Sequence, residues 1–164
     1  SNSSISASHF KPAVLTIIIF LKIITMTADQ IQSFLQQEFP ENPMFVESCE
    51  NRRARLRLDV DHTHLRPGGT VSGPTMMLLA DTAMYAAILT TMGGVVLAVT
   101  TNLNINFLRK PEPHRDLVGE SWLMKMGKRL IVGEVIIYSQ GDPEPVAHAT
   151  CTYSIPPQSI TNKS

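Results

Sequence analysis

A single long apolar segment near the middle of the chain limits the folds that it can adopt. The segment reads SGPTMMLLADTAMYAAI from Ser72, and its only ionisable groups before Met92 are the carboxylate of Asp81 and the weakly acidic phenol of Tyr85. Residues that are apolar or small on nearly every side predict a helix enclosed by the rest of the protein. A buried carboxylate without a partner is costly, so Asp81 either has a partner or is retained for chemistry.

The ends of this helix are marked by residues typical of helix boundaries. Pro74 fits the first turn, because the N–H group that proline lacks would have no partner there. Gly93 and Gly94 are typical of a helix end. We therefore expect a helix from about Pro74 to Thr91, on the order of 27 Å long at the usual rise per residue.

Shorter elements lie on both sides of this helix in the sequence. Thr27 and Gln30 form a capping-box pattern, which predicts a short amphipathic helix that runs to about Phe39. Alternating apolar and polar residues predict strands. The expected strands are Met44–Glu50, Arg52–Asp61, Val99–Phe107, Leu117–Met126, Leu130–Ser139 and Val146–Ile155.

In this order the elements predict a single α+β domain. Its antiparallel sheet of about five to six strands would wrap around the one long central helix and bury its apolar face there. The element order is β-β-α-β-β-β-β after the short N-terminal helix. Charged residues alternate with apolar ones along Arg52–Asp61, so we expect that strand to present its charged side to water.

The first 26 residues differ in composition from the rest of the chain. They contain no aspartate or glutamate, and their apolar run Ala13–Leu21 is shorter than the about 20 residues that a membrane-spanning helix needs. We interpret residues 1–26 as an N-terminal extension: a leader, a non-native segment or a targeting segment. Residues 27–157 are then the folded domain, for which no membrane partner is expected, and residues 158–164 are a polar tail.

The overall composition argues against several classes of function. The 14 basic and 14 acidic residues balance without a block of like charge, so nucleic acid is not an expected partner. Cys49 and Cys151 are too few for a disulfide framework, and we expect both to be buried in a reducing compartment. His62 and His64 have no third ligand nearby, which favours a turn over a metal site.

Two stretches of the sequence together resemble a known family. The central helix carries the pattern G-x-x-x-x-x-L-A-D-T-A from Gly73 to Ala83, and NLNINFLRKP follows from Asn102. With the later Gly-Lys-Arg turn, they resemble the hot-dog fold and, within it, the PaaI-like acyl-CoA thioesterases, over about Met44–Ile155. The resemblance implies a homodimer whose sheets join edge to edge, often paired again into a homotetramer, with active sites at the subunit interface.

The resemblance assigns roles to individual residues. The family's acidic residue falls on Asp81, and the glycine whose N–H polarises the thioester carbonyl falls on Gly73. Thr100 is the nearest match to a hydroxyl residue that assists in some relatives. Ser72 stands where many relatives have a histidine, and it can still cap the helix. It lacks the G-x-S-x-G context of a nucleophile elbow, which argues against a role as nucleophile. Arg66 replaces an asparagine that often holds the water, and it is a candidate for substrate binding.

Further residues are candidates for substrate binding. Because Pro74 has no N–H, either Thr75 or a water would assist Gly73 in polarising the carbonyl. Two basic pairs could meet the phosphates of coenzyme A; they are Arg109 with Lys110 and Lys128 with Arg129. Three methionines of the helix are expected to fill the core more than to line an acyl pocket: Met76, Met77 and Met84.

The chemistry of thioester hydrolysis fits these residues. The reaction needs a base that activates water, or a carboxylate that attacks directly, and donors directed at the developing oxyanion. A general base contributes about 10²–10⁴-fold and one oxyanion donor about 10²–10³-fold. A helix start supplies unpaired N–H groups. Across an interface, Asp81 of one chain could approach a carbonyl held at the partner's helix start, near Gly73.

We therefore expect a cytoplasmic acyl-CoA thioesterase that acts on a small, medium-chain or aryl acyl-CoA, with Asp81 as general base or nucleophile. No metal or bound cofactor is expected, because coenzyme A arrives with the substrate. One alternative is a non-catalytic acyl-CoA-binding hot-dog dimer, in which Asp81 only fixes the dimer register. A second is a hydratase-type hot-dog enzyme. That class usually has a histidine five residues after the aspartate, where this chain has Ala86.

Overall fold

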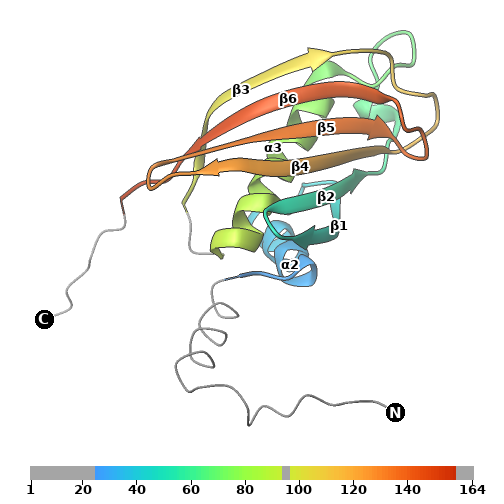
Figure 1. Cartoon of the computed structure of the whole chain (residues 1–164). Helices are drawn as coiled ribbons and strands as arrows, with labels where there is room; N and C mark the ends of the chain where they lie inside the picture. Colours follow the sequence, from blue (N-terminus) through green and yellow to red (C-terminus); the bar gives the residue numbers. More distant parts are fainter. Residues whose placement is uncertain (1–24, 94–96, 158–164) are drawn as a thin grey trace, which may run out of the picture.

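The computed structural model describes residues 25–93 and 97–157. Within them, a sheet of six strands curves over one long helix, with a shorter helix at its side (Figure 1). The predicted α+β class, central helix and element order are confirmed. In chain order the elements are α2 (Ala28–Glu38), β1 (Met44–Glu50), β2 (Arg53–Leu58), the 3₁₀ turn η2 (His62–His64), α3 (Gly73–Met92), β3 (Val99–Phe107), β4 (Leu117–Met126), β5 (Leu130–Ser139) and β6 (Pro145–Ser154).

The sheet is antiparallel, and its strand order is β1-β2-β4-β5-β6-β3. β3 follows α3 directly in the sequence, yet it joins the sheet at the edge opposite β1, beside β6. α3 therefore connects the β1-β2 side of the sheet with its far edge and lies across one face (Figure 1). The predictions for most of the N-terminal extension and for the polar tail fall on residues 1–24 and 158–164, outside the described residues.

α3 lies close to the sheet because two glycines leave room for it. A Cβ atom at Gly133 of β5 would lie 2.7 Å from the sulfur of Met84, and one at Gly119 of β4 would lie 3.1 Å from the side chain of Leu79. Ser121 of β4 adds a polar contact, since its hydroxyl donates a 2.7 Å hydrogen bond to a carbonyl of α3. These close contacts fix the position of α3 against the sheet.

One side of α3 remains uncovered by the sheet. Between residues 76 and 90 the exposed or half-buried positions recur at helical spacing: Met77, Leu78, Asp81 and Tyr85. The prediction that Met77 fills the core is wrong, because its side chain is 40% exposed. By length and composition alone α3 could cross a membrane, but most of it is buried inside the domain, as is typical of a core helix.

α2 is fastened to the edge of the sheet and to the end of α3. Thr27 and Gln30 form the predicted capping box at its start. Gln32 binds the backbone of β1 twice: its amide NH₂ donates to the carbonyl of Met44 at 3.3 Å, and its amide oxygen accepts from the N–H of Val46 at 2.6 Å. These hydrogen bonds hold α2 in place beside the uncovered side of α3.

The charged side of β2 faces outward, as expected, but its arginines are paired. Arg55 forms ion pairs with Glu47 and Glu120, and Arg57 contacts Glu47 and Asp116. The strand ends at Leu58 instead of Asp61. The carboxylate of Asp116, which is distant in the sequence, accepts the N–H group of Val60, and Asp61 then caps the turn η2.

Both cysteines are free thiols, and only one of them is fully buried. Burial, together with the negative charge of Asp81, raises the pKa of Cys151 to about 12. Cys49 is only half-buried, contrary to the prediction, although burial still raises its pKa to about 11. Across the described ranges, no group of three or more histidine, cysteine, aspartate or glutamate side chains is placed to hold a metal ion.

Candidate active site

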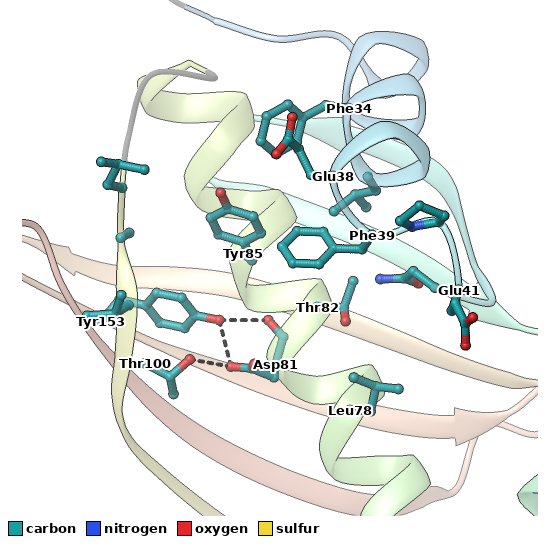
Figure 2. Close-up of a pocket in the computed structure, with 16 residues that line it drawn as sticks. Phe34, Glu38, Phe39, Glu41, Leu78, Asp81, Thr82, Tyr85, Thr100 and Tyr153 are labelled. Carbon is teal, nitrogen blue, oxygen red and sulfur yellow. Dashed lines mark hydrogen bonds between the residues drawn. The ribbon is translucent and has the colours of Figure 1, made fainter.

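Asp81 lies on the uncovered side of α3, with β3 and β6 on one side of it and α2 on the other (Figure 2). Its carboxylate oxygen Oδ1 accepts a 2.7 Å hydrogen bond from the hydroxyl of Thr100 and a 2.6 Å hydrogen bond from the hydroxyl of Tyr153. The Tyr153 oxygen also lies 3.0 Å from the backbone carbonyl oxygen of Asp81. The carboxylate in the apolar helix therefore has polar partners within its own chain.

The other carboxylate oxygen, Oδ2, accepts no hydrogen bond from the described part of the chain, since both donors bind Oδ1. Among the described residues, no buried side-chain oxygen or nitrogen lacks a partner, so Oδ2 is not sealed inside the protein. Asp81 lines a cleft, and of its two carboxylate oxygens only Oδ2 is without a hydrogen-bond partner among the described residues. One oxygen of the carboxylate is held and the other is accessible.

A β-bulge places Thr100 next to Asp81. In β3, Thr100 pairs with Tyr153 and Asn102 with Thr152, so Thr101 is an extra residue between the two pairs. Residues directly opposite each other in an antiparallel pair point to the same face. Tyr153 points toward α3, and Thr100 therefore does too. The regular alternation expected along Val99–Phe107 is therefore interrupted at Thr101.

Tyr153 is the member of this cluster that the sequence reasoning did not identify as functional. The sequence predicts only that it belongs to the last strand, Val146–Ile155. Burial and the negative charge of Asp81 raise its pKa far above the usual range of a phenol, so its hydroxyl remains protonated and acts as a donor. The available signal was the residue type, because a tyrosine on a buried strand face needs a partner for its hydroxyl.

The cleft beside Asp81 has a volume of about 820 Å³. Its walls come from α2 and the loop after it, from α3, from the start of β3 and from β6 (Figure 2). The rings of Tyr85 and Tyr153 stack along one wall, with centroids 6.2 Å apart and an interplanar angle of 7°. Most of the lining is apolar or aromatic, including Phe34, Leu35, Phe39, Leu78, Leu97 and Val99. We call Asp81, Thr100 and Tyr153 the carboxylate half-site.

Gly73 lies in a second cleft, of about 430 Å³. Phe107 closes one side of it, because a Cβ atom at Gly73 would lie 3.2 Å from its ring. Three of the cations predicted to bind substrate line the same cleft: Arg66, Arg109 and Lys110. We call these three residues and Gly73 the cationic half-site. Asp81 follows Gly73 by eight residues, about 12 Å along the helix axis, and does not line this cleft.

Ser72 and Thr75 are engaged with each other at the start of α3. The hydroxyl of Ser72 accepts the N–H of Thr75 at 3.3 Å, which confirms that Ser72 caps the helix. The two hydroxyl oxygens also lie 2.8 Å apart. Because the N–H of Thr75 is already bonded, Gly73 is left as the donor at this helix start, while Pro74 has no N–H.

Lys128 and Arg129 lie apart from both clefts. They are exposed in the turn between β4 and β5. The carbonyl of Arg129 accepts the N–H of Ile155, which places this turn at the end of β6, near Tyr153. Arg109 and Lys110 follow the opposite end of β3, where Arg109 pairs with Glu144 at 3.1 Å. The two predicted basic pairs therefore lie at opposite ends of the sheet.

Comparison with known proteins identifies the family and the fold. A profile described as the thioesterase superfamily matches residues 68–146, a range that includes Gly73, Asp81 and Thr100. The solved structure of a candidate thioesterase from Silicibacter sp. TM1040 shares 43% identity with this chain, covers 82% of it and 94% of its own length, and gives a TM-score of 0.77. The chain belongs to the thioesterase superfamily. Its fold is the hot-dog fold, as the resemblance implied.

The present chain shares its fold with solved structures of lower sequence identity. Zebrafish thioesterase superfamily member 2 is 18% identical, with 80% of this chain and all of that chain covered and a TM-score of 0.72. A mutant of the phenylacetic acid degradation protein PaaI from Thermus thermophilus is 22% identical, with 74% and 97% covered and a TM-score of 0.61. No curated protein matches the sequence significantly.

Proposed function

We propose that this thioesterase hydrolyses the thioester bond of an acyl-CoA at a site formed between two copies of the chain. Asp81 either takes a proton from a water that attacks the thioester carbonyl carbon, or attacks that carbon itself to form an anhydride that water then hydrolyses. In both routes the C–S bond breaks and coenzyme A leaves as the thiol. The N–H of the partner's Gly73 donates to the developing oxyanion. The observation that carries the proposal is the Asp81 carboxylate, held through Oδ1 and open through Oδ2 to a largely apolar cleft.

The acyl group would occupy the cleft beside Asp81. A volume of about 820 Å³ and a largely apolar, aromatic lining are typical of a site for a small organic group. Phe34, Phe39 and Tyr85 offer ring faces and edges to such a group. These features support a medium-chain or aryl acyl group, although a smaller one would also enter.

Antiparallel pairing of two β3 strands would join the two kinds of half-site. β3 is an edge strand of nine residues without proline or lysine, the residues that commonly prevent edge pairing. Near its start, Thr100 belongs to the carboxylate half-site, and its last residue, Phe107, packs on Gly73. A two-fold axis places the start of one β3 beside the end of the other. Each Asp81 then lies near the partner's Gly73.

Exposed apolar side chains along the same edge support this dimer. Val99 is 60% exposed and Phe107 49% exposed on β3, and Leu78 on α3 is 48% exposed. Pairing of the edges would remove this surface from water. In the proposed site, the cations Arg66, Arg109 and Lys110 near the oxyanion donor would meet the phosphates of coenzyme A.

An activity assay with a matched pair of variants tests the proposal. Purified protein is offered a panel of short-chain, medium-chain and aryl acyl-CoA substrates, and released thiol is measured. Asp81→Asn is expected to lower kcat at least ~100-fold, because the amide can serve neither as base nor as nucleophile. The control Asp29→Asn makes the same change at an exposed position in the first turn of α2 and should retain full activity.

The outcomes of this assay separate the alternatives. Equal and very slow release by the unmodified protein and by Asp81→Asn, with tight binding of acyl-CoA, would contradict the proposal in favour of a binding protein. Conversion of an enoyl-CoA to its hydroxy product would favour a hydratase. The structure gives no support to the hydratase, since Ala86 is buried and no histidine of the described residues lines the cleft beside Asp81.

A further inference from the structure

We infer that Tyr153 is a positioning residue of this reaction, which holds Oδ1 of Asp81 and thereby makes Oδ2 the reacting oxygen. The inference rests on the proposed function. It concerns a residue outside the segment that the thioesterase profile matches, since that match ends at residue 146. The Tyr153 ring lines the cleft and its hydroxyl is bonded to Asp81, so we assign its effect on the reaction to the carboxylate.

The hydrogen-bond geometry favours one orientation of the carboxylate. The Tyr153 hydroxyl lies 2.6 Å from the side-chain oxygen Oδ1 and 3.0 Å from the backbone oxygen of the same aspartate. The hydroxyl therefore bridges the side chain and the backbone of Asp81, and it restricts rotation of the carboxylate about the Cβ–Cγ bond. Thr100 donates to the same oxygen from the other strand. With both donors on Oδ1, the rotation that exchanges the two oxygens would break two bonds.

Tyr153 is also rigid and remains a donor. Its side chain is only 3% exposed, and β6 is an interior strand with hydrogen-bonded neighbours on both sides. Its ring stacks on Tyr85, whose ring in turn contacts Phe34 with centroids 6.4 Å apart. Burial and the charge of Asp81 raise the pKa of the phenol, so the donor proton is kept at neutral pH.

The expected consequence is catalytic preorganisation. A reacting group displaced by about 1 Å can lose on the order of 10²-fold in rate. Thr100 is exposed in the single chain whereas Tyr153 is buried among its neighbours, so Thr100 is the less constrained of the two donors. Tyr153 is then the group that determines where the carboxylate points before substrate arrives.

The test compares two identical chemical changes on the sheet. Tyr153→Phe removes the hydroxyl beside Asp81, whereas Tyr138→Phe removes a hydroxyl from a half-buried position of β5. Tyr153→Phe is expected to lower kcat by about 10- to 100-fold with KM changed less than about 3-fold, and Tyr138→Phe to match the unmodified protein. Replacement of Tyr153 by 4-aminophenylalanine, which keeps the ring and a donor, should restore most of kcat.

A double-mutant measurement in the Asp81→Asn variant separates a positioning role of Tyr153 from a structural role. In Asp81→Asn, the additional change Tyr153→Phe should cost less than about 2-fold in kcat, because the group through which Tyr153 acts is already lost. A further loss as large as that in the unmodified background would overturn the inference. So would a Tyr153→Phe protein that no longer folds in circular dichroism, or one that 4-aminophenylalanine does not restore.

The inference and the proposed function fail in different ways. If the unmodified protein hydrolyses acyl-CoA and Tyr153→Phe equals Tyr138→Phe, only the inference is wrong. If the unmodified protein hydrolyses no acyl-CoA, the proposed function is wrong and the inference falls with it.

Discussion

Thr100 reaches Asp81 with a 2.7 Å hydrogen bond although the two residues lie on the edge strand and on the central helix. The bond depends on one extra residue, Thr101, which interrupts the regular pairing of β3 with β6. Without that bulge, Thr101 would face the helix and Thr100 would face outward. A local irregularity of an edge strand thus supplies a polar partner to the only carboxylate of α3.

Loss of the Thr100 hydroxyl should weaken catalysis. Thr100→Val is expected to lower kcat about 10-fold, because one of two hydrogen bonds to a charged group is lost while that of Tyr153 remains. Thr100→Ser keeps a hydroxyl at the same position and should stay within about 2-fold. The neighbouring change Thr101→Val alters an exposed side chain that bonds only to a carbonyl of β6, and it serves as the control. Equal kcat for Thr100→Val and Thr101→Val would contradict the prediction.

Complementation between two inactive variants tests whether the site is shared. Gly73→Pro removes the proposed oxyanion donor, and the extended backbone of Ser72 already suits a following proline. Homodimers of Gly73→Pro and of Asp81→Asn should both retain only a small residual activity. After unfolding and refolding as an equal mixture, mixed dimers contain one intact site, and about a quarter of the unmodified activity should return.

The control for that experiment is Gly73→Ala. It keeps the N–H but adds a Cβ atom that would lie 3.2 Å from the ring of Phe107, so the ring must shift slightly. We expect Gly73→Ala to retain much more activity than Gly73→Pro. Refolded mixtures that remain inactive, beside an active refolded unmodified protein, would show that both half-sites do not meet across an interface.

The close approach of α3 to the sheet predicts a strong effect of Gly133→Ala on stability. A Cβ atom there would lie 2.6 Å from the backbone oxygen of Trp122 and 2.7 Å from the sulfur of Met84, and the backbone cannot move aside easily. We expect a loss of about 1–3 kcal/mol in the free energy of unfolding. Gly119→Ala meets only the flexible side chain of Leu79 and the Cβ of Ala83 at an ordinary distance, and should cost less. Urea unfolding monitored by circular dichroism measures both, and equal midpoints would contradict this account.

The raised pKa values of the two cysteines predict a slow reaction with thiol reagents. With a pKa of about 12 for Cys151 and about 11 for Cys49, the thiolate fractions at pH 8 are on the order of 10⁻⁴ and 10⁻³. Labelling of the native protein by an aromatic disulfide reagent should therefore accelerate about tenfold for each unit of pH between 8 and 10. Unfolded protein should react much faster at pH 8. Rapid labelling of two thiols in the native state would refute the prediction.

Much of the architecture follows from local sequence patterns. An apolar run that starts with Ser72-Gly73-Pro74 and ends at Gly93 has one stable outcome, a capped helix with Ser72 as its N-cap. The period of two along the strands determines which residues can face that helix. The end of β2 does not follow from such patterns. The alternation predicts a strand that continues to Asp61, but the strand ends at Leu58 because Asp116, which is distant in the sequence, accepts the backbone N–H of Val60.

The carboxylate in the middle of α3 is the feature of the site that the sequence marked by itself, because charge within an apolar helix is costly and therefore has a reason. The sequence also indicated the cations Arg66, Arg109 and Lys110, but only the folded chain collects them in one cleft with Gly73 and leaves Asp81 in another. The contact of Tyr153 with Asp81 and the orientation of the Thr100 side chain toward α3 depend on tertiary structure. Both depend on the register between β3 and β6, two strands that are far apart in the sequence. A register with a bulge is selected by packing across the whole sheet and not by the residues of either strand alone.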